Sequence, residues 1–545
     1  MAVDKTKFAV VSSQMSRFND NVCNGLATVQ IPDALKYVDR LFQAAQKIFP
    51  PELVYQGWRY MTPYEEYRIV TQRGSSGTTT LELAKSDMYM VAFRFSFDGQ
   101  PLEERPLYLP FVGPGGTITI RGSRFTISPL LTDPSVSVGV DHIYIPVGQA
   151  KITYRRESQS FLKNGRVEMG DVVWAKIYRR KQKNSRQGAP AIKANTCLMH
   201  YLLAKYGLVR TFSMMRGVDI RVGDDLTMTE ANYPPSEWAI LTSTGNPSKY
   251  LKDKFATATR LRLAVRHSQY DFVVASMIAG VFYIAELFPQ RLLAEYVDGS
   301  REELRLWRIF LGHLIFPAGG SEGRLVDDVN NHLETVDEYL DALSQEELAR
   351  DGVVCSDIYG LFMKVIETFN QRITKSGSRI ASMADKRLTV LKFALYDIRK
   401  AIYMMSYMLK SKAKKRLTAD DTKKIMRKWL KHDLVKEMNS GHGEVTSIAS
   451  PGDCMIFKLT STLVPQTNSA GTESGGSKST ATMSDPTKFL HATIAEVGSF
   501  GNLPKSDPSG RSRVNPYLTV EPDGTIVHKP QFAALLESVQ QKIKR

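Results

Sequence analysis

Hydrophobic and polar residues recur with two different periods along this chain, and the periods separate strand-rich from helical stretches. Residues 1–50 have a helical period, and residues 78–180 alternate with the period of two that is typical of half-buried strands. From residue 191 to about residue 435 the pattern is mainly helical, with a nearly all-apolar helix at 272–288 and another at 388–409. After Ile31-Pro32-Asp33, the apolar positions that share one helical face are Leu35, Val38, Leu41 and Phe42. The pattern predicts an α+β fold.

A β-hairpin is the clearest local element, between residues 113 and 136. Residues 117–120 alternate as a half-buried strand does, Arg121-Gly122-Ser123 supplies a tight turn, and residues 125–127 return. An ordinary surface hairpin has the same pattern. The hairpin therefore indicates local structure and leaves function open.

Length and composition limit the class of protein. A chain of 545 residues is too long for one core, so we expect two to four domains. An apolar content of 43% is typical of a globular protein. The sequence contains no run of 18 apolar residues that would predict a membrane span, and the N-terminus lacks the apolar core of a signal peptide. The four cysteines have no metal-ligand spacing, which favours a reducing compartment without a zinc site or a disulfide framework.

The net charge of +16 predicts a polyanionic partner, and nucleic acid is the usual one. The alternative is a basic surface kept for solubility or for an acidic protein. Two clusters hold much of the charge. The first comprises Lys176, Arg179, Arg180, Lys181, Lys183 and Arg186. The second comprises Lys410, Lys412, Lys414, Lys415, Arg416, Lys423, Lys424, Arg427, Lys428 and Lys431. Either cluster could bind phosphates or be a solvated face.

The second cluster includes a predicted helix. Thr418 is its expected cap, and Asp420-Asp421 follow in the first turn. The apolar stripe of this helix is Ile425, Trp429 and Leu430. The basic residues therefore lie on an amphipathic helix.

No catalytic motif is present in the sequence. Residues 113–116 are glycine-rich but lack the Lys-Ser/Thr of a phosphate-binding loop, and no nucleophile elbow or histidine pair at i, i+4 occurs. Phe97-Asp98-Gly99-Gln100 offers one carboxylate. The adjacent pairs Asp224-Asp225, Asp327-Asp328 and Asp420-Asp421 are typical of caps or surface acids. Two-metal nucleotidyl transfer needs converging carboxylates, so we expect the isolated chain to be catalytically inactive.

Five segments resemble, in the same order, the region near the start of the β subunit of multisubunit RNA polymerases. The segments are residues 113–136, 150–152, 172–181, 192–196 and 202–207. A second resemblance involves residues 385–388, 484–493 and 502–516, which follow the order of the β-subunit fork region. There, a Pro/Gly-rich loop with basic side chains would suit contact with a nucleic-acid backbone. The candidate residues of this region are Lys488, Lys505, Arg511 and Arg513.

The resemblance implies a domain organisation. Residues 1–145 and 375–445 would form a protrusion-like domain, residues 150–370 a lobe-like domain, and residues 446–545 a fork-like region. The last contains a Ser/Gly-rich loop at 466–485. It ends in an amphipathic helix with Phe532, Leu535, Leu536, Val539 and Ile543.

The resemblance also implies a function. The chain stops before the later parts of a β subunit, so we expect the N-terminal part of a split β subunit, as in the RNA polymerases of giant tailed bacteriophages. Its partners would be the C-terminal part of β, β′-like subunits, DNA and RNA, with a promoter-specificity subunit left open, and no membrane. Mg²⁺ would be bound by a β′-like partner. We expect the host cytoplasm or a phage-made compartment, with the virion left open. The alternative is a viral nucleoprotein that coats nucleic acid, or a structural protein without enzyme activity.

Overall fold

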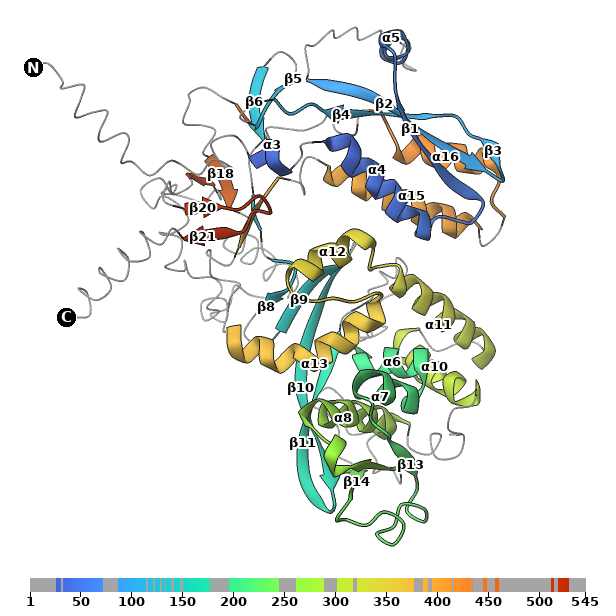
Figure 1. Ribbon diagram of the computed structural model, residues 1–545. Coiled ribbons are helices and arrows are strands. Elements are labelled where there is room, and N and C mark those ends of the chain that lie inside the picture. Colours follow the sequence, from blue (N-terminus) through green and yellow to red (C-terminus); the bar gives the residue numbers. More distant parts are fainter. Residues whose placement is uncertain are drawn as a thin grey trace, which may run out of the picture. The chain divides into compact units, whose positions relative to one another are not determined.

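The computed structural model describes the chain in segments that form two compact units, residues 1–134 with 379–545 (unit 1) and residues 135–378 (unit 2). The described segments are 26–30, 33–71, 87–113, 116–120, 123–127, 130–132, 134–138, 142–147, 150–175, 177, 196–244, 261–288, 301–316, 321–376, 386–390, 395–413, 416–432, 434, 445–447, 456–459, 511–513 and 518–528. Helices and strands occur in both units (Figure 1). The α+β fold predicted from the sequence is confirmed.

Unit 1 contains a four-stranded antiparallel sheet in which β2 (Met88–Phe97) lies between β1 (Leu53–Tyr60) and β4 (Arg105–Pro110). The short β3 (Gln100–Pro101) pairs with the end of β2 through a turn at Asp98 and Gly99, both with positive φ. Tight hairpin turns with positive φ at both central residues favour the sequence Asp-Gly, which is the sequence found here.

Helix α4 (Ala34–Ala45) contacts β1 and β4, and α15 (Tyr396–Ala413) packs against α4 (Figure 1). Asp33 caps α4 by accepting a hydrogen bond from Lys36 N at 3.0 Å. All four apolar residues of the predicted helical face are buried, and the ring of Phe42 lies 4.9 Å from that of Phe93. The predicted face is therefore the core-facing side of α4.

Shorter helices complete this part of unit 1. They are α3 (Leu26–Gln30), the 3₁₀ turn η1 (Gln46–Ile48), α5 (Pro63–Thr71) and α16 (Ala419–Trp429). Thr62 and Glu65 form a capping box at the start of α5, because each side chain accepts a hydrogen bond from the other's backbone N–H.

The predicted hairpin is confirmed as β5 (Thr117–Ile120) and β6 (Ser123–Ile127). Ser123 pairs with Ile120, so the connection is two residues long and one residue shorter than predicted. A third strand, β17 (Val445–Ser447), pairs with β6 from far along the sequence.

A second sheet of unit 1 joins four distant segments in the order β16 (Arg387–Thr389), β7 (Leu130–Thr132), β18 (Ile456–Leu459) and β19 (Arg511–Arg513). We call it the small sheet. The sequence predicts a helix from residue 388, but Leu388 is in a strand and α15 begins at Tyr396. Pairing with β7, which is distant in sequence, overrides the local helical pattern there.

The hairpin of β20 (Leu518–Val520) and β21 (Ile526–His528) contacts the small sheet at its turn. Leu388 N donates a hydrogen bond to Gly524 O at 2.9 Å. Gly524 has a φ of +88°, and a Cβ there would lie 1.9 Å from Leu388 O. Only glycine fits this position.

Unit 2 is built on an eight-stranded sheet whose centre is the long hairpin of β10 (Ala150–Lys163) and β11 (Arg166–Ala175). Asn164 and Gly165, both with positive φ, form its turn. The other strands are β8 (Ser137–Val138), β9 (His142–Val147), β12 (Thr196–Cys197), β13 (Arg221–Gly223), β14 (Trp238–Ser243) and β15 (Arg262–Arg266). The range 191–435, predicted to be mainly helical, thus also holds short strands, β12 to β16, whose apolar residues resemble helix segments.

Helix α8 (Phe272–Leu287) lies on β11 (Figure 1). Every residue from Val274 to Glu286 is buried, as its nearly all-apolar sequence predicts. Gly170 permits the close approach, because a Cβ there would lie 2.4 Å from Ala275 O.

The remaining elements of unit 2 are helical and share one large apolar core with the sheet. They are α6 (Leu198–Tyr206), α7 (Leu208–Arg216), η3 (His267–Gln269), α10 (Arg301–Ile315), α11 (Glu322–Asp337), α12 (Ala342–Arg350) and α13 (Ile358–Ser376). The buried Glu303 carboxylate accepts hydrogen bonds from Leu208 N at 2.7 Å and Trp307 Nε1 at 3.0 Å. It thereby occupies the N-terminal end of α7, beside Gly207.

Candidate nucleic-acid interface

The second basic cluster lies on the hairpin formed by α15 and α16 in unit 1, which we call the α15–α16 hairpin. Thr418 caps α16 as predicted, since its Oγ1 accepts a hydrogen bond from Asp421 N at 3.2 Å. Arg416 is exposed between the two helices, whereas Lys414 and Lys415 lie outside the described residues. Residues 396–432 hold twelve Lys or Arg against three Asp. This hairpin is therefore a strongly basic part of unit 1.

Part of this charge is paired with carboxylates. Lys412 Nζ lies 3.7 Å from Asp421 Oδ1, and Lys423 Nζ lies 3.8 Å from Asp420 Oδ1. Arg427 donates from Nε to Glu103 Oε2 at 3.1 Å, which ties α16 to the segment before β4.

Glu103 also lies 2.8 Å from the guanidinium of Arg105. The hydrogen bond from Arg427, followed by the charge of Arg105, holds the pKa of Glu103 below its usual range, although partial burial opposes the shift. Burial lowers the pKa of Arg105. Glu103 is thus the shared acceptor of two arginines, and these basic groups serve the fold.

Other basic residues of the α15–α16 hairpin are exposed and are not paired with the carboxylates described above. Lys424, Lys428 and Lys431 are exposed, and none of them has an ion pair with a described residue. Lys428 Nζ lies 5.7 Å from the ring of its neighbour Trp429. The hairpin therefore has both paired and open basic residues.

The small sheet collects a second set of basic residues. Antiparallel pairing of β18 with β19 places Arg511 opposite Lys458 and Arg513 opposite Ile456. Because residues two apart in a strand share a face, Arg511 and Arg513 share a face with Lys458. In β16, Arg387 is opposite Thr132 of β7.

Sequence analysis missed Lys458 and Arg387 as members of this group. Each is a single basic residue in an unremarkable local sequence, and only the pairing of distant strands places it in the same sheet as Arg511 and Arg513. No local sequence signal could have found them.

The remaining predicted site residues lie outside the described residues. They are Arg179, Arg180, Lys181, Lys488 and Lys505. Of the segments that carry the resemblance, 150–152 falls in β10, 172–175 in β11 and 202–206 in α6. The candidate role of these five basic residues stays a prediction.

One buried side-chain pair has the composition of a nucleophilic site. Cys197 Sγ lies 3.0 Å from His200 Nδ1, and both residues are buried in unit 2. Burial raises the pKa of the Cys197 thiol to about 12 and lowers the pKa of His200 to about 3. Both groups are therefore neutral and shielded from substrate, so this pair is structural.

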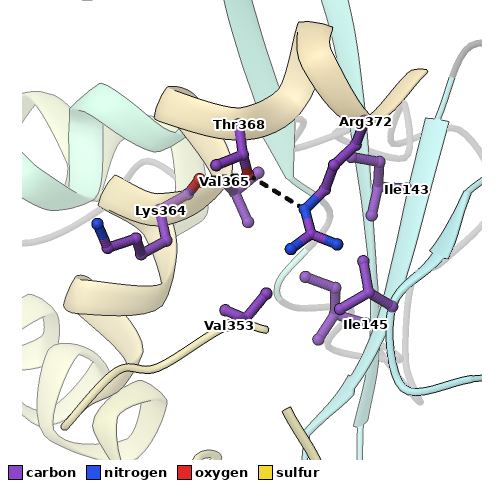
Figure 2. Close-up of a pocket in the computed structure, with 8 residues that line it drawn as sticks. Ile143, Ile145, Val353, Lys364, Val365, Thr368 and Arg372 are labelled. Atoms are coloured by element: carbon purple, nitrogen blue, oxygen red, sulfur yellow. Dashed lines mark hydrogen bonds between the residues drawn. The ribbon is translucent and has the colours of Figure 1, made fainter. Parts of the chain in front are cut away.

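Figure 2 shows a small cavity between α13 and the sheet of unit 2. Its volume is about 10 Å³, enough for about one water molecule. Arg372 donates from Nε to Thr368 Oγ1 at 3.3 Å and from Nη2 to Asp351 O at 3.5 Å. Ile143, Ile145 and Val353 supply apolar walls. The cavity is a packing gap, far too small for a nucleotide.

The carboxylates of the described part do not gather into a metal site. Among these residues, no group of three or more His, Cys, Asp or Glu is placed to hold a metal ion. Asp224 is instead a local cap that accepts hydrogen bonds from Leu226 N and Thr227 N, which lower its pKa. The described residues therefore do not fit a Mg²⁺ site. In the same part of the chain, no helix is long and apolar enough to cross a bilayer.

A match over nearly the whole chain identifies the class of protein as a subunit of an RNA polymerase. The model of the family described as non-virion RNA polymerase subunit matches residues 6–541, so the chain belongs to that family. A search of curated protein sequences found no match.

Family membership confirms the RNA polymerase part of the sequence-based interpretation and does not support the alternative of a coating nucleoprotein. A subunit implies partner subunits. The description as non-virion also fits an enzyme that acts outside the virus particle.

Proposed function

We propose that this chain is the N-terminal part of a split, β-like subunit of a phage-encoded, DNA-dependent RNA polymerase that transcribes phage genes in the host bacterial cytoplasm. It forms one side of the DNA and RNA cleft. Its partners are the C-terminal part of β and β′-like subunits. Mg²⁺ is bound by a β′-like partner.

One observation supports the β-like assignment above the others. The segments that carry the resemblance are widely separated in sequence, yet the small sheet joins parts of three of them: residues 130–132, 387–388 and 511–513. A chance set of similar patches has no reason to assemble into one sheet. The pairing of β18 with both β7 and β19 makes the connection continuous.

The division of the chain into two units supports a separate lobe-like domain. Unit 2 spans residues 135–378, and the lobe-like domain is proposed for 150–370. The unit begins before residue 150 because β8 and β9 pair with the sheet that contains β10. Unit 1 combines the fork-like range with most of the protrusion-like ranges, whose residues 135–145 and 375–378 fall in unit 2.

The assembly is tested by co-purification. A tagged copy of the chain, expressed during infection, is expected to retain β- and β′-like chains that mass spectrometry identifies, one of them with several converging carboxylates. The complex should incorporate nucleotides on DNA with Mg²⁺, whereas the isolated chain should not. RNA synthesis by the isolated chain, or purification without polymerase chains, would contradict the proposal.

The nucleic-acid role of the predicted residues has its own test. Alanine substitution of Arg179, Arg180 and Lys181, or separately of Lys505, Arg511 and Arg513, is expected to weaken binding of the complex to unrelated DNA sequences by similar factors. Phosphate contacts carry no base information, so the loss should shrink at high salt. Unchanged binding by both variants at low salt would show that these residues are solvated surface.

A further inference from the structure

The basic residues of α16 divide into two sets with different surroundings. Lys423 and Arg427 each lie within 4 Å of a carboxylate, Asp420 and Glu103 respectively. Lys424 and Lys428 lie one turn apart on another face of the same helix, and Lys431 lies just after its C-terminal end. The first set is paired with carboxylates, and the second is exposed to solvent.

The open set carries an energetic cost in the free protein. Like charges at i, i+4 destabilise a helix, and Lys424 and Lys428 have this spacing. The two carboxylates of the first turn of α16 are already paired, Asp420 with Lys423 and Asp421 with Lys412. A polyanion placed along this face would relieve the repulsion.

The residue types point to the kind of polyanion. Lysine is a compact point charge that suits phosphate, whereas the planar, two-pronged donor geometry of arginine is better suited to reading guanine in the major groove. The one arginine of α16, Arg427, is held by Glu103. The open set therefore suits the backbone of a nucleic acid and not its bases.

The aromatic content of α16 separates duplex from single strand. Single-strand binding relies on exposed rings on which bases stack. The one aromatic residue of α16, Trp429, is half-buried, and its Nε1 is buried. The helix thus offers charge without a stacking surface.

We propose that α16 makes a sequence-independent contact with the phosphate backbone of duplex DNA through Lys424, Lys428 and Lys431. This inference rests on the proposed polymerase function for its biological setting and adds a part of the chain that holds the duplex. The contact with DNA can be measured on the full-length chain without its partner subunits.

The test is a salt titration of DNA binding by the full-length chain, followed by fluorescence anisotropy with labelled duplexes of two unrelated sequences. The test variant is Lys424→Gln with Lys428→Gln and Lys431→Gln. The matched control is Lys423→Gln with Arg427→Gln, on the same helix. A third variant replaces the three open lysines by arginine, which keeps the charge.

Each lost phosphate contact reduces the slope of log affinity against log salt by about 0.9 for duplex DNA. The test variant is expected to reduce the slope by about 2 to 3 and to weaken binding at low salt at least tenfold on both duplexes. The control should change the slope by less than about 1, and the arginine variant should keep it.

Three results would overturn the inference: equal slopes for test variant and wild type, an equal loss in the control, or a loss seen with single-stranded DNA or RNA but not with duplex. A lowered melting temperature with unchanged DNA affinity would show that the lysines serve only the helix. Co-purification of the test variant with polymerase chains separates the two proposals. If the variant assembles normally and binds DNA as the wild type does, only this inference fails.

Discussion

The sheet of unit 2 and the small sheet of unit 1 are built in opposite ways. All strands of the first lie between residues 137 and 266, and its longest pairing is a hairpin closed by a two-residue turn. The strands of the small sheet have three or four residues each and come from positions near 130, 388, 457 and 512. Local pairing closes short loops, whereas the small sheet must close loops of tens to hundreds of residues.

The two sheets also differ in what stabilises them. The unit 2 sheet shares a continuous apolar core with its helices. In the small sheet, the described residues around β16 make polar contacts with other segments: Gln30 accepts from Val390 N and donates to Leu388 O, each at 2.9 Å, and Gly524 O accepts from Leu388 N. We therefore expect unit 2 to unfold cooperatively and the small sheet to open locally.

Acid should produce the largest effect, in unit 2. Burial lowers the pKa of His200 to about 3 and that of His332 to about 4. Between these pKa values and about pH 6.5 the unfolded chain binds more protons than the folded chain. The contribution of the two neutral histidines to the free energy of unfolding is therefore fully present above about pH 6.5 and is lost as the pH falls toward their folded-state pKa values. The loss should be roughly 3 kcal/mol or more per histidine.

Hydrogen exchange of unit 2 peptides at pH 7 and pH 4 measures this effect. The His332→Phe variant should lose part of the pH dependence, because one buried titrating group is removed. Identical pH profiles for the two proteins would contradict the buried, neutral state of His332.

Gly170→Leu should break the packing of α8 on β11. Its Cβ would approach Ala275 O to 2.4 Å, so the helix must move away from the sheet. We expect a loss of about 3 kcal/mol or more in the free energy of unfolding of unit 2. The control is Gly323→Ala in α11, where no atom lies within 4 Å of the added Cβ and a gain of about 0.5 kcal/mol is expected. Denaturant unfolding distinguishes the two, and equal effects would refute the close-approach argument.

Gly524→Ala should open the small sheet while leaving unit 2 unchanged. The new Cβ would collide with Leu388 O, and φ at this position is +88°. We expect a local loss of about 2 kcal/mol, seen as faster hydrogen exchange at 386–390 and 518–528. Gly99→Ala has a positive φ but open space, and should cost only about 1 kcal/mol. Faster exchange throughout unit 2 would show that the two sheets are not independent.

The smallest effects concern the ion pairs of Glu103. Arg427→Gln removes a pair between side chains that are 60% and 49% exposed, and should cost less than about 1 kcal/mol. Glu103→Gln should cost more, because Arg105, with a side chain 9% exposed, then loses its carboxylate. Thermal unfolding of both variants tests the order, and the reverse order would contradict the role of Glu103 as shared acceptor.

The sequence by itself determined the elements whose information is local. The apolar face of α4, the all-apolar α8, the Thr418 cap and the hairpin of β5 and β6 were all predicted, because side-chain period, capping and turn residues act within a few positions. Charge clustering likewise placed basic residues on α16.

Only the tertiary structure decided which distant segments pair. Leu388 has a helical pattern yet lies in β16, since β7 offers backbone hydrogen bonds and Gly524 supplies a further acceptor. Lys458 has no local signal and is placed by β18 opposite Arg511. The ion pair of Arg427 could not be predicted from the sequence either, because its partner Glu103 is more than 300 residues away. The period of apolar residues predicts which side of an element is buried, but it does not predict which distant segment the element packs against.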